Sequence, residues 1–399
     1  MSWEKIKFSN LYSVESRNGL TKPSKVRGSG YKMINMGELF SHDRIYDIPM
    51  ELVPLTEREK CSSKVESGDL LFARQSLVLE GAGKCSIVMD VSPLTVFESH
   101  LIRVRLDSKR ANPLFYYYYF KSPQSPIKSI VSQCAQSGIR GSDLGELCVD
   151  FPILTIQNRI ADILSAYDDL IENNQKQIKL LEEAAQRLYK EWFVDLRFPG
   201  YENTPFVDGV PEGWKKTFLG EMCSLRKETV SAEQVSSEIP YIGLEHMPRV
   251  DFCLSTWGNA DDVTSNKFRY MEDDIIFGKI RPYFHKVGFA LNSGIVSTDS
   301  FVMKAKQGIW GLLLMTVFDK SFVDYTYQTC KEGAKMPRAD WIQMKKYSVL
   351  IPQEEILKQF EEFIWNITRN IKTIAIQNRA LTEARDRLLP KLMSGELEE

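Results

Sequence analysis

The fold is decided by residues 152–193, which read PILTIQNRIADILSAYDDLIENNQKQIKLLEEAAQRLYKEWF. A second copy occupies residues 352–393 and reads PQEEILKQFEEFIWNITRNIKTIAIQNRALTEARDRLLPKLM, so the copies align at a constant offset without a gap. Such long-period self-similarity indicates an internal repeat, which has to be recognised before single elements are assigned. Positions identical in the two copies include Ile156/Ile356, Gln177/Gln377, Glu183/Glu383 and Leu188/Leu388.

Each copy also carries seam residues in alternating steps of four and three along its length. This is the a/d pattern of a coiled coil. One such helix extends about 50 Å and cannot bury its seam alone, so we expect the two copies to pair with each other as an antiparallel coiled coil. The central seam positions are Ile171, Asn174, Ile178, Leu181, Ile371, Ile374, Asn378 and Leu381.

Two of these seam positions are polar. Antiparallel pairing about the middle of the seam places Asn174 and Asn378 in the same layer, although the repeat aligns Asn174 with Ile374. A buried Asn pair costs stability but specifies the register of a coiled coil. The alternative is that both amides lie at a hydrated edge, and the sequence leaves the two possibilities open.

Composition indicates an ordinary globular protein of two or three domains. The chain has 399 residues, 43% hydrophobic and 26% charged, with a formal net charge of −2. Its apolar runs are too short to span a bilayer, and its charged N-terminus does not resemble a signal peptide. The seven cysteines contain no CxxC pair, which favours reduced thiols. We therefore expect a cytoplasmic protein without a membrane segment.

The repeat extends beyond the helices. Gly68–Arg74 parallels Asp273–Lys279, since both segments are acidic turns that enter a short apolar strand and end in a basic residue. Gly-containing basic loops then precede the strands that end at Pro152 and Pro352. We expect an α+β fold in which two α+β heads alternate with the helices. The expected boundaries are head 1 at 1–151, helix 1 at 152–198, a linker at 199–213, head 2 at 214–351 and helix 2 at 352–399.

Motifs for catalysis are missing from the sequence. The four histidines are dispersed, which argues against a metal site. The chain has no phosphate-binding loop, no nucleophile elbow and no Asn-Pro-Pro-aromatic motif of amino methyltransferases. Asp273, Asp274 and Lys279 loosely resemble a nuclease pattern, but head 1 has the same strand entry with Asp69 and Arg74. We therefore predict no catalytic residues and no metal ligands.

The loops of both heads carry residue types that suit nucleic-acid recognition. Arg and Gln can form paired hydrogen bonds to guanine and adenine edges, while Lys neutralises phosphate. For any single residue a solvated surface charge is the simpler interpretation, so the prediction concerns the loops as groups. The candidate DNA-binding residues are Arg74, Gln75, Ser76 and Arg140 in head 1, and Lys279, Arg281, Tyr283, His285, Lys286, Lys335 and Arg338 in head 2.

With these features the sequence resembles the specificity subunit of type I restriction–modification enzymes. The resemblance rests on the segments 191–199 (EWFVDLRFP), 388–396 (LLPKLMSGE) and 274–283 (DIIFGKIRPY), and the order of the repeat extends it to the whole chain. It implies that the heads are two target-recognition domains, each of which reads one half of a split, asymmetric DNA target. It also implies that the antiparallel coiled coil sets the gap between the half-sites.

The resemblance further implies partners and cofactors outside this chain. The expected partners are double-stranded DNA and two methyltransferase subunits, which modify adenine N6 with S-adenosylmethionine. Restriction subunits that use ATP and Mg can join such complexes. The chain itself is expected to be non-catalytic and to bind no cofactor. Two rival readings remain: a coiled-coil adaptor that reads no DNA, and a self-contained methyltransferase or nuclease.

The chain departs from exact internal symmetry in ways that bear on function. The loops of the two heads differ strongly, so we expect the heads to read different half-sites. Arg385 stands in the seam where the first copy has Ala185, so the two ends of the coiled coil are not equivalent. Recognition domains of this family vary widely, and contacting residues therefore cannot be transferred one by one.

Overall fold

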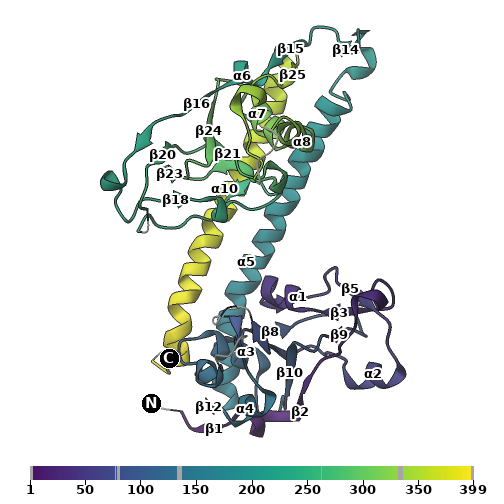
Figure 1. Ribbon diagram of the computed structural model, residues 1–399, viewed down its shortest axis with the longest axis vertical. Coiled ribbons are helices and arrows are strands. Elements are labelled where there is room, and N and C mark those ends of the chain that lie inside the picture. The colour runs from purple at the N-terminus through teal and green to yellow at the C-terminus, as the bar shows by residue number, and fades with distance from the viewer. Residues whose placement is uncertain are drawn as a thin grey trace. The chain divides into compact units, whose positions relative to one another are not determined.

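The computed structural model describes residues 3–76, 78, 81–132, 137–261, 263–330 and 336–396. The chain forms two compact units (Figure 1). Unit 1 comprises residues 1–169 and 381–399, and unit 2 comprises residues 170–380. Each unit therefore combines one head with one end of both long helices, α5 (Leu154–Tyr189) and α10 (Glu354–Met393).

Unit 1 contains short strands and helices before α5. Its elements are β1 (Lys5–Lys7), β2 (Tyr12–Asn18), β3 (Tyr31–Ile34), α1 (Met36–Ser41), β4 (Arg44–Ile45), β5 (Glu51–Val53), α2 (Glu57–Ser62), β6 (Leu70–Ala73), β7 (Gln75–Ser76), β8 (Cys85–Val88), β9 (Val96–Phe97), β10 (Leu101–Leu106), α3 (Pro113–Lys121), β11 (Ser137–Gly138), α4 (Gly141–Glu146) and β12 (Cys148–Asp150).

Unit 2 begins within α5, which passes into a π-helical turn at Lys190–Val194. The remaining elements are β13 (Phe206–Val207), β14 (Val210–Pro211), β15 (Lys215–Phe218), α6 (Leu219–Met222), β16 (Cys223–Leu225), β17 (Thr229–Val230), β18 (Tyr241–Ile242), β19 (Cys253–Leu254), β20 (Lys267–Tyr270), β21 (Ile275–Gly278), β22 (Val287–Ala290), β23 (Gly294–Val296), β24 (Ser300–Ala305), α7 (Trp310–Phe318), α8 (Lys320–Gln328), α9 (Trp341–Met344) and β25 (Ser348–Ile351).

The main sheets of the two heads have the same topology, which confirms the α+β class and extends the repeat to the heads. The main sheet of head 1 has the strand order β2-β10-β6-β8-β4, and that of head 2 has the order β16-β24-β21-β22-β19. In both sheets only the last pair is parallel, β4 with β8 and β19 with β22. A two-stranded ladder, β1 with β12 or β15 with β25, precedes the long helix in each case.

Helix α3 attaches head 1 to the helices because it is aromatic on all sides. Its residues Phe115–Phe120 are all buried. Buried tyrosine hydroxyls need hydrogen-bond partners. Tyr116 donates to the carbonyl oxygen of Asp150 at 3.1 Å, and Tyr118 donates to Asp168 Oδ2 on α5 at 2.7 Å. The apolar core of unit 1 also includes Leu164 of α5 and Leu392 of α10.

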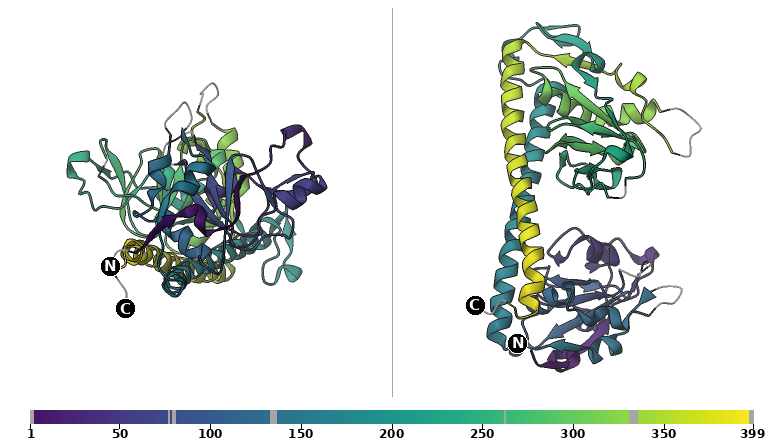
Figure 2. Two further views of the ribbon diagram at one scale, coloured as in Figure 1. Left: turned by 90° about the horizontal axis from the view of Figure 1, so that it is seen from below. Right: turned by 90° about the vertical axis from the view of Figure 1, so that its left-hand side faces the viewer.

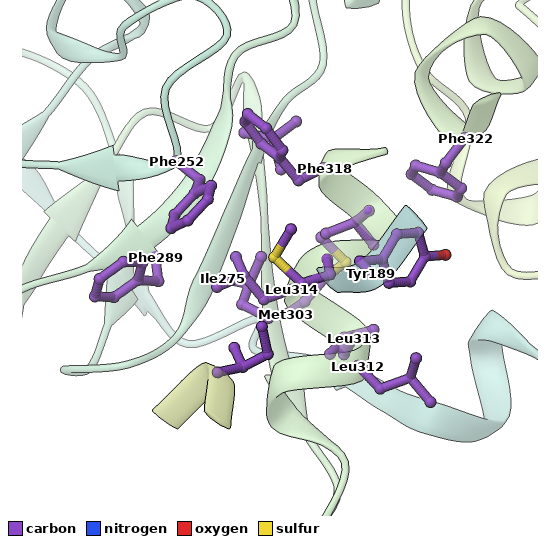
Figure 3. Packing of buried hydrophobic residues seen from close by; sticks show 14 of the residues in the cluster. Tyr189, Phe252, Ile275, Phe289, Met303, Leu312, Leu313, Leu314, Phe318 and Phe322 are labelled. Atoms are coloured by element: carbon purple, nitrogen blue, oxygen red, sulfur yellow. The ribbon is translucent and has the colours of Figure 1, made fainter. Parts of the chain in front are cut away.

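The core of unit 2 likewise joins its head to both helices. Figure 3 shows Tyr189 of α5 among Leu312–Leu314 of α7, with Phe252 and Phe318 on the sheet side of the cluster. Tyr189 also approaches Phe360 of α10, with ring centroids 6.4 Å apart. Each helix therefore shares its buried face between its partner helix and a head.

Within each unit α5 and α10 pack side by side, and Figure 2 shows this pairing from a second direction. The seam residues Ile171 and Ile371 are 8% and 0% exposed. The other predicted apolar seam positions, Ile178, Leu181, Ile374 and Leu381, are half-buried. Ala375 is more buried than its neighbour Ile374, because the buried stripe also turns toward the head.

The two seam asparagines form one layer, as antiparallel pairing predicted. Asn174 Nδ2 donates to Asn378 Oδ1 at 2.9 Å, and Asn378 Nδ2 donates to the carbonyl oxygen of Ile171 at 3.2 Å. Both side chains are half-buried. The layer is therefore a direct amide pair that remains partly open to water.

Arg385 has a specific partner in unit 1. Its Nη1 atom lies 2.5 Å from Oδ1 of Asp168, a residue that is only 6% exposed. Asp168 also accepts the hydroxyl hydrogen bond of Tyr118, and Arg385 forms a second ion pair with Asp386 at 2.8 Å. This end of the helix pair thus encloses a satisfied charge cluster.

A buried carboxylate of α5 holds a strand of head 2. Glu182 is 3% exposed and accepts hydrogen bonds at 2.9 Å from the backbone nitrogens of Phe252 and Cys253. Burial, aided by the negative charge of Asp251, raises the pKa of Glu182 to about 7. Glu361 of α10 plays a similar part, since it accepts from the backbone nitrogens of Gly311 and Leu312 at 2.7 Å.

The raised pKa of Glu182 predicts a pH-dependent stability. The folded protein holds this proton more tightly than the unfolded chain, so the free energy of unfolding decreases as pH rises from about 4.5 to about 7. Glu182→Gln keeps an oxygen acceptor without the charge. Between pH 5 and pH 8 we expect the free energy of unfolding of wild type to fall by on the order of 3 kcal/mol relative to that of this variant. Urea unfolding measures both values.

Glu183 provides the matched control for this experiment. It is the exposed neighbour of Glu182 on the same helix. Glu183→Gln should leave the pH profile of wild type unchanged. A Glu182→Gln profile that runs parallel to wild type across this range would show that the buried carboxyl does not titrate as expected.

Among the described residues, no helix combines the length and apolar character that crossing a membrane requires.

Candidate nucleic-acid interface

In head 2 the loop after β21 and the segment before α9 meet at one edge of the main sheet. The backbone nitrogen of Arg281 donates to the carbonyl oxygen of Pro337, and that of Ala339 donates to the carbonyl oxygen of Lys279, both at 2.8 Å. Ile280 and Arg338 form the β-bridge between them. The two groups of candidate residues, far apart in sequence, therefore lie side by side.

The side chain of Lys279 is fastened to head 2 and does not extend freely into solvent. Its Nζ atom donates to the carbonyl oxygen of Thr298 at 2.6 Å, and it lies 4.5 Å from the ring centroid of Phe301 and 5.4 Å from that of Phe268. Burial lowers the pKa of Lys279. These contacts close the end of β21 against the sheet.

His285 and Lys286 are also held by backbone carbonyls. His285 Nε2 lies 2.6 Å from the carbonyl oxygen of Phe318, so this nitrogen carries the proton, and the two rings pack 4.6 Å apart. Lys286 Nζ donates to the carbonyl oxygen of Leu244. Burial lowers the pKa of both side chains. Both residues therefore fasten the loop to the core of head 2.

Between these anchors the loop has a strained backbone. Arg281 and His285 have φ angles of 50° and 52°, in the left-handed region, and they flank a 3-10 turn at Pro282–Phe284. Residues other than glycine rarely adopt this conformation, and such strain clusters at functional sites. Within this turn the side chain of Tyr283 is exposed and that of Arg281 is half-buried.

Cations and aromatic rings gather around this turn. Arg249 lies 3.9 Å above the ring centroid of Phe284, and Arg281 lies 5.7 Å from the same centroid. The ring of Tyr283, 47% exposed, packs edge-on against the equally exposed Tyr327 of α8 at 5.3 Å. Exposed aromatic faces beside arginine suit stacking on bases and contact with phosphate. We call Arg249, Arg281, Tyr283, Phe284 and Tyr327 the aromatic turn cluster.

Head 1 builds the same framework with different side chains. The backbone nitrogen of Ile139 donates to the carbonyl oxygen of Arg74 at 2.9 Å, which repeats the Ala339–Lys279 bond of head 2. Arg74 Nη1 lies 3.5 Å from the carbonyl oxygen of Ser99, the counterpart of the Lys279–Thr298 contact. The basic residue at the end of the strand therefore has a structural part in both heads.

The tips of the two frameworks differ. In head 1, β7 pairs with β11 at the Gln75–Gly138 and Ser76–Ser137 positions, and His100 Nδ1 hydrogen-bonds Gln75 Oε1 at 3.0 Å. Arg140 is exposed at the start of α4. In head 2 the exposed Arg338 instead forms an ion pair with Asp299. Equivalent frameworks thus present different polar groups.

Within each head the structure brings the predicted residues close together, but their surroundings differ. Lys335 lies outside the described residues. Arg249, Phe284 and Tyr327 were missed by the sequence reasoning. Phe284 stands within the predicted 279–286 segment and could have been found as an aromatic beside cations, whereas Arg249 and Tyr327 reach the turn from distant segments without a local signal.

Within the described ranges, no group of three or more His, Cys, Asp or Glu residues could hold a metal ion. The aromatic turn cluster brings guanidinium groups and aromatic rings together on a strained loop.

Comparisons with known proteins fit this arrangement. A family profile described as "Type I restriction modification DNA specificity domain" matches residues 2–183. The type I restriction enzyme MjaIX specificity subunit of Methanocaldococcus jannaschii is 24% identical over 99% of this chain and 93% of its own length. The HindI specificity subunit of Haemophilus influenzae is 23% identical over 64% of this chain and 70% of its own length.

A solved structure shows the same fold. The S subunit of a type I restriction–modification system from M. genitalium superposes with a TM-score of 0.60 at 16% identity, covering 98% of this chain and 96% of that chain. Two heads whose five-stranded sheets share one strand topology define a duplicated protein. Over nearly its whole length the chain is therefore similar to type I restriction–modification specificity subunits.

Proposed function

We propose that this chain is the DNA-reading subunit of a type I restriction–modification system. Each head reads one half of a bipartite, asymmetric target in double-stranded DNA. The observation that carries the proposal is that both heads share one framework but present different side chains at its tip. Each framework holds one DNA-reading loop, so the chain has two such loops. Because the side chains at the two tips differ, the two loops read different half-sites.

The edge loops supply the contacts for this reading. The aromatic turn cluster of head 2 offers Arg281 for base edges or phosphate and Tyr283 for stacking. Gln75 and Arg140 have the corresponding place in head 1. Lys279, His285 and Lys286 hold the loop, because each side chain is fastened to a backbone carbonyl of head 2.

The helices provide the second part of the proposed function. Both α5 and α10 run through the two units, so they set the spacing of the half-sites. They also dock two methyltransferase subunits, which carry S-adenosylmethionine and methylate adenine N6. Methylation requires a base flipped from the stack, so reader and methyltransferase have to hold the duplex together. ATP and Mg belong to restriction subunits, and this chain is non-catalytic.

Methylation mapping tests the proposal. The chain is co-expressed with the methyltransferase subunit encoded beside it, and N6-methyladenine is mapped across the genome of the host. We expect a split, asymmetric motif with two half-sites. A complex that forms but methylates no defined motif would contradict the reading function and favour a coiled-coil adaptor.

A further inference from the structure

The polar residues of the helix seams are distributed differently on α5 and α10. The internal repeat allows each layer to be compared with its counterpart. In unit 1 the buried Asp168 of α5 binds Arg385 of α10. The counterparts in unit 2 are Thr368 and Ala185, which are 2% and 0% exposed. One end of the pairing is therefore ionic, and the other is small and uncharged.

The asparagine layer follows the same rule. Asn174 of α5 bonds Asn378 of α10 in unit 2. The residues that the repeat places at the counterpart positions are Ile374 and Ile178, both half-buried in that unit. Each helix thus carries one amide and one isoleucine, in an order that matches only the other helix.

Pairing of like helices would break both layers. If α5 packed against α5 of a second copy in the same antiparallel register, Asp168 would face Ala185 and Asn174 would face Ile178. If α10 packed against α10, Arg385 would face Thr368 and Asn378 would face Ile374. An unpaired charge or amide in a packed seam is costly, and one polar layer is enough to select a coiled-coil partner.

We infer that the seam of α5 is a docking surface specific for the seam of α10, and that the Asp168–Arg385 and Asn174–Asn378 layers exclude pairing between identical halves of two chains. This keeps one copy of each head on every helix pair. The inference concerns association and stands apart from the proposed DNA reading, because its test does not use DNA.

A nicked full-length chain tests the inference. A protease site is inserted between Asp208 and Gly209, which are both exposed in the turn of the β13–β14 hairpin. Two preparations with different tags on the N-terminal half are cut, mixed, partly unfolded in urea and refolded. We expect each tagged N-terminal half to capture C-terminal halves. N-terminal halves that carry the other tag should be at least tenfold less abundant than C-terminal halves in the captured material.

Two variants make the test specific for the seam. The quadruple variant Asp168→Thr/Asn174→Ile/Arg385→Ala/Asn378→Ile makes the layers of the two helices alike, and we expect mixed-tag complexes to appear. The variant Asp168→Arg/Arg385→Asp keeps the ion pair, so we expect its tagged N-terminal halves to capture only C-terminal halves. The inference would be overturned by mixed-tag complexes in wild type, or by a refolded quadruple variant that still forms none.

Discussion

Replacing Arg281 by asparagine and Tyr283 by alanine is expected to weaken sequence-specific duplex binding by the methyltransferase complex on the order of 100-fold or more. A base-reading arginine and a stacked ring each contribute about 1–3 kcal/mol. Asparagine tolerates the left-handed backbone of position 281, and Tyr283 is 47% exposed, so the fold should be retained. Titration of a duplex that contains the mapped target, at one fixed salt concentration, measures the loss.

The same head offers a matched control in Lys216→Asn/Phe218→Ala. These two residues are exposed on β15, two positions apart. Their substitution removes the same charge and a comparable ring as the Arg281 and Tyr283 variant. The β15–β25 ladder precedes α10 and contributes nothing to the aromatic turn cluster. We expect wild-type binding from the control. Equal affinities of the two variants would remove the aromatic turn cluster from the reading surface.

Asp168→Ala is expected to lower the free energy of unfolding by about 3 kcal/mol. The substitution leaves the guanidinium of Arg385, 21% exposed, without its buried partner and frees the hydroxyl of Tyr118. The remaining ion pair with Asp386 limits the cost. Urea unfolding at neutral pH measures the change in free energy.

A double variant separates the lost ion pair from simple loss of packing. Asp168→Thr/Arg385→Ala reproduces the Thr368–Ala185 combination that is buried in unit 2. Because no charge is left unpaired, we expect the double variant to be more stable than Asp168→Ala, by about 1–2 kcal/mol. Additive losses in the double variant would show that Asp168 and Arg385 do not act as a pair.

Much of the architecture could be predicted from the sequence because it is encoded by regular spacing along the chain. The steps of four and three in residues 152–193 and 352–393 predict two helices, and the matched strand entries at Asp69 and Asp274 predict a corresponding strand in each of two α+β heads. The antiparallel relation also predicts that Asn174 and Asn378 share a layer, because this follows from their positions on helices of known period, whereas the direct amide contact is seen only in the structure. Arg385 was recognised as a departure from the repeat, but its partner was not.

Only the tertiary structure decided which cations are available at the surface. In the sequence, Lys279, His285 and Lys286 are as good candidates for a free surface cation as Arg281. In the structure, backbone carbonyls from distant segments bind all three. A carbonyl group belongs to every residue and leaves no trace in the sequence, so its encounter with a side chain depends on the fold. The sequence by itself determined the duplication, the helix pair and the approximate location of the loops. Long-range packing determined which side chains anchor the loops and which remain exposed.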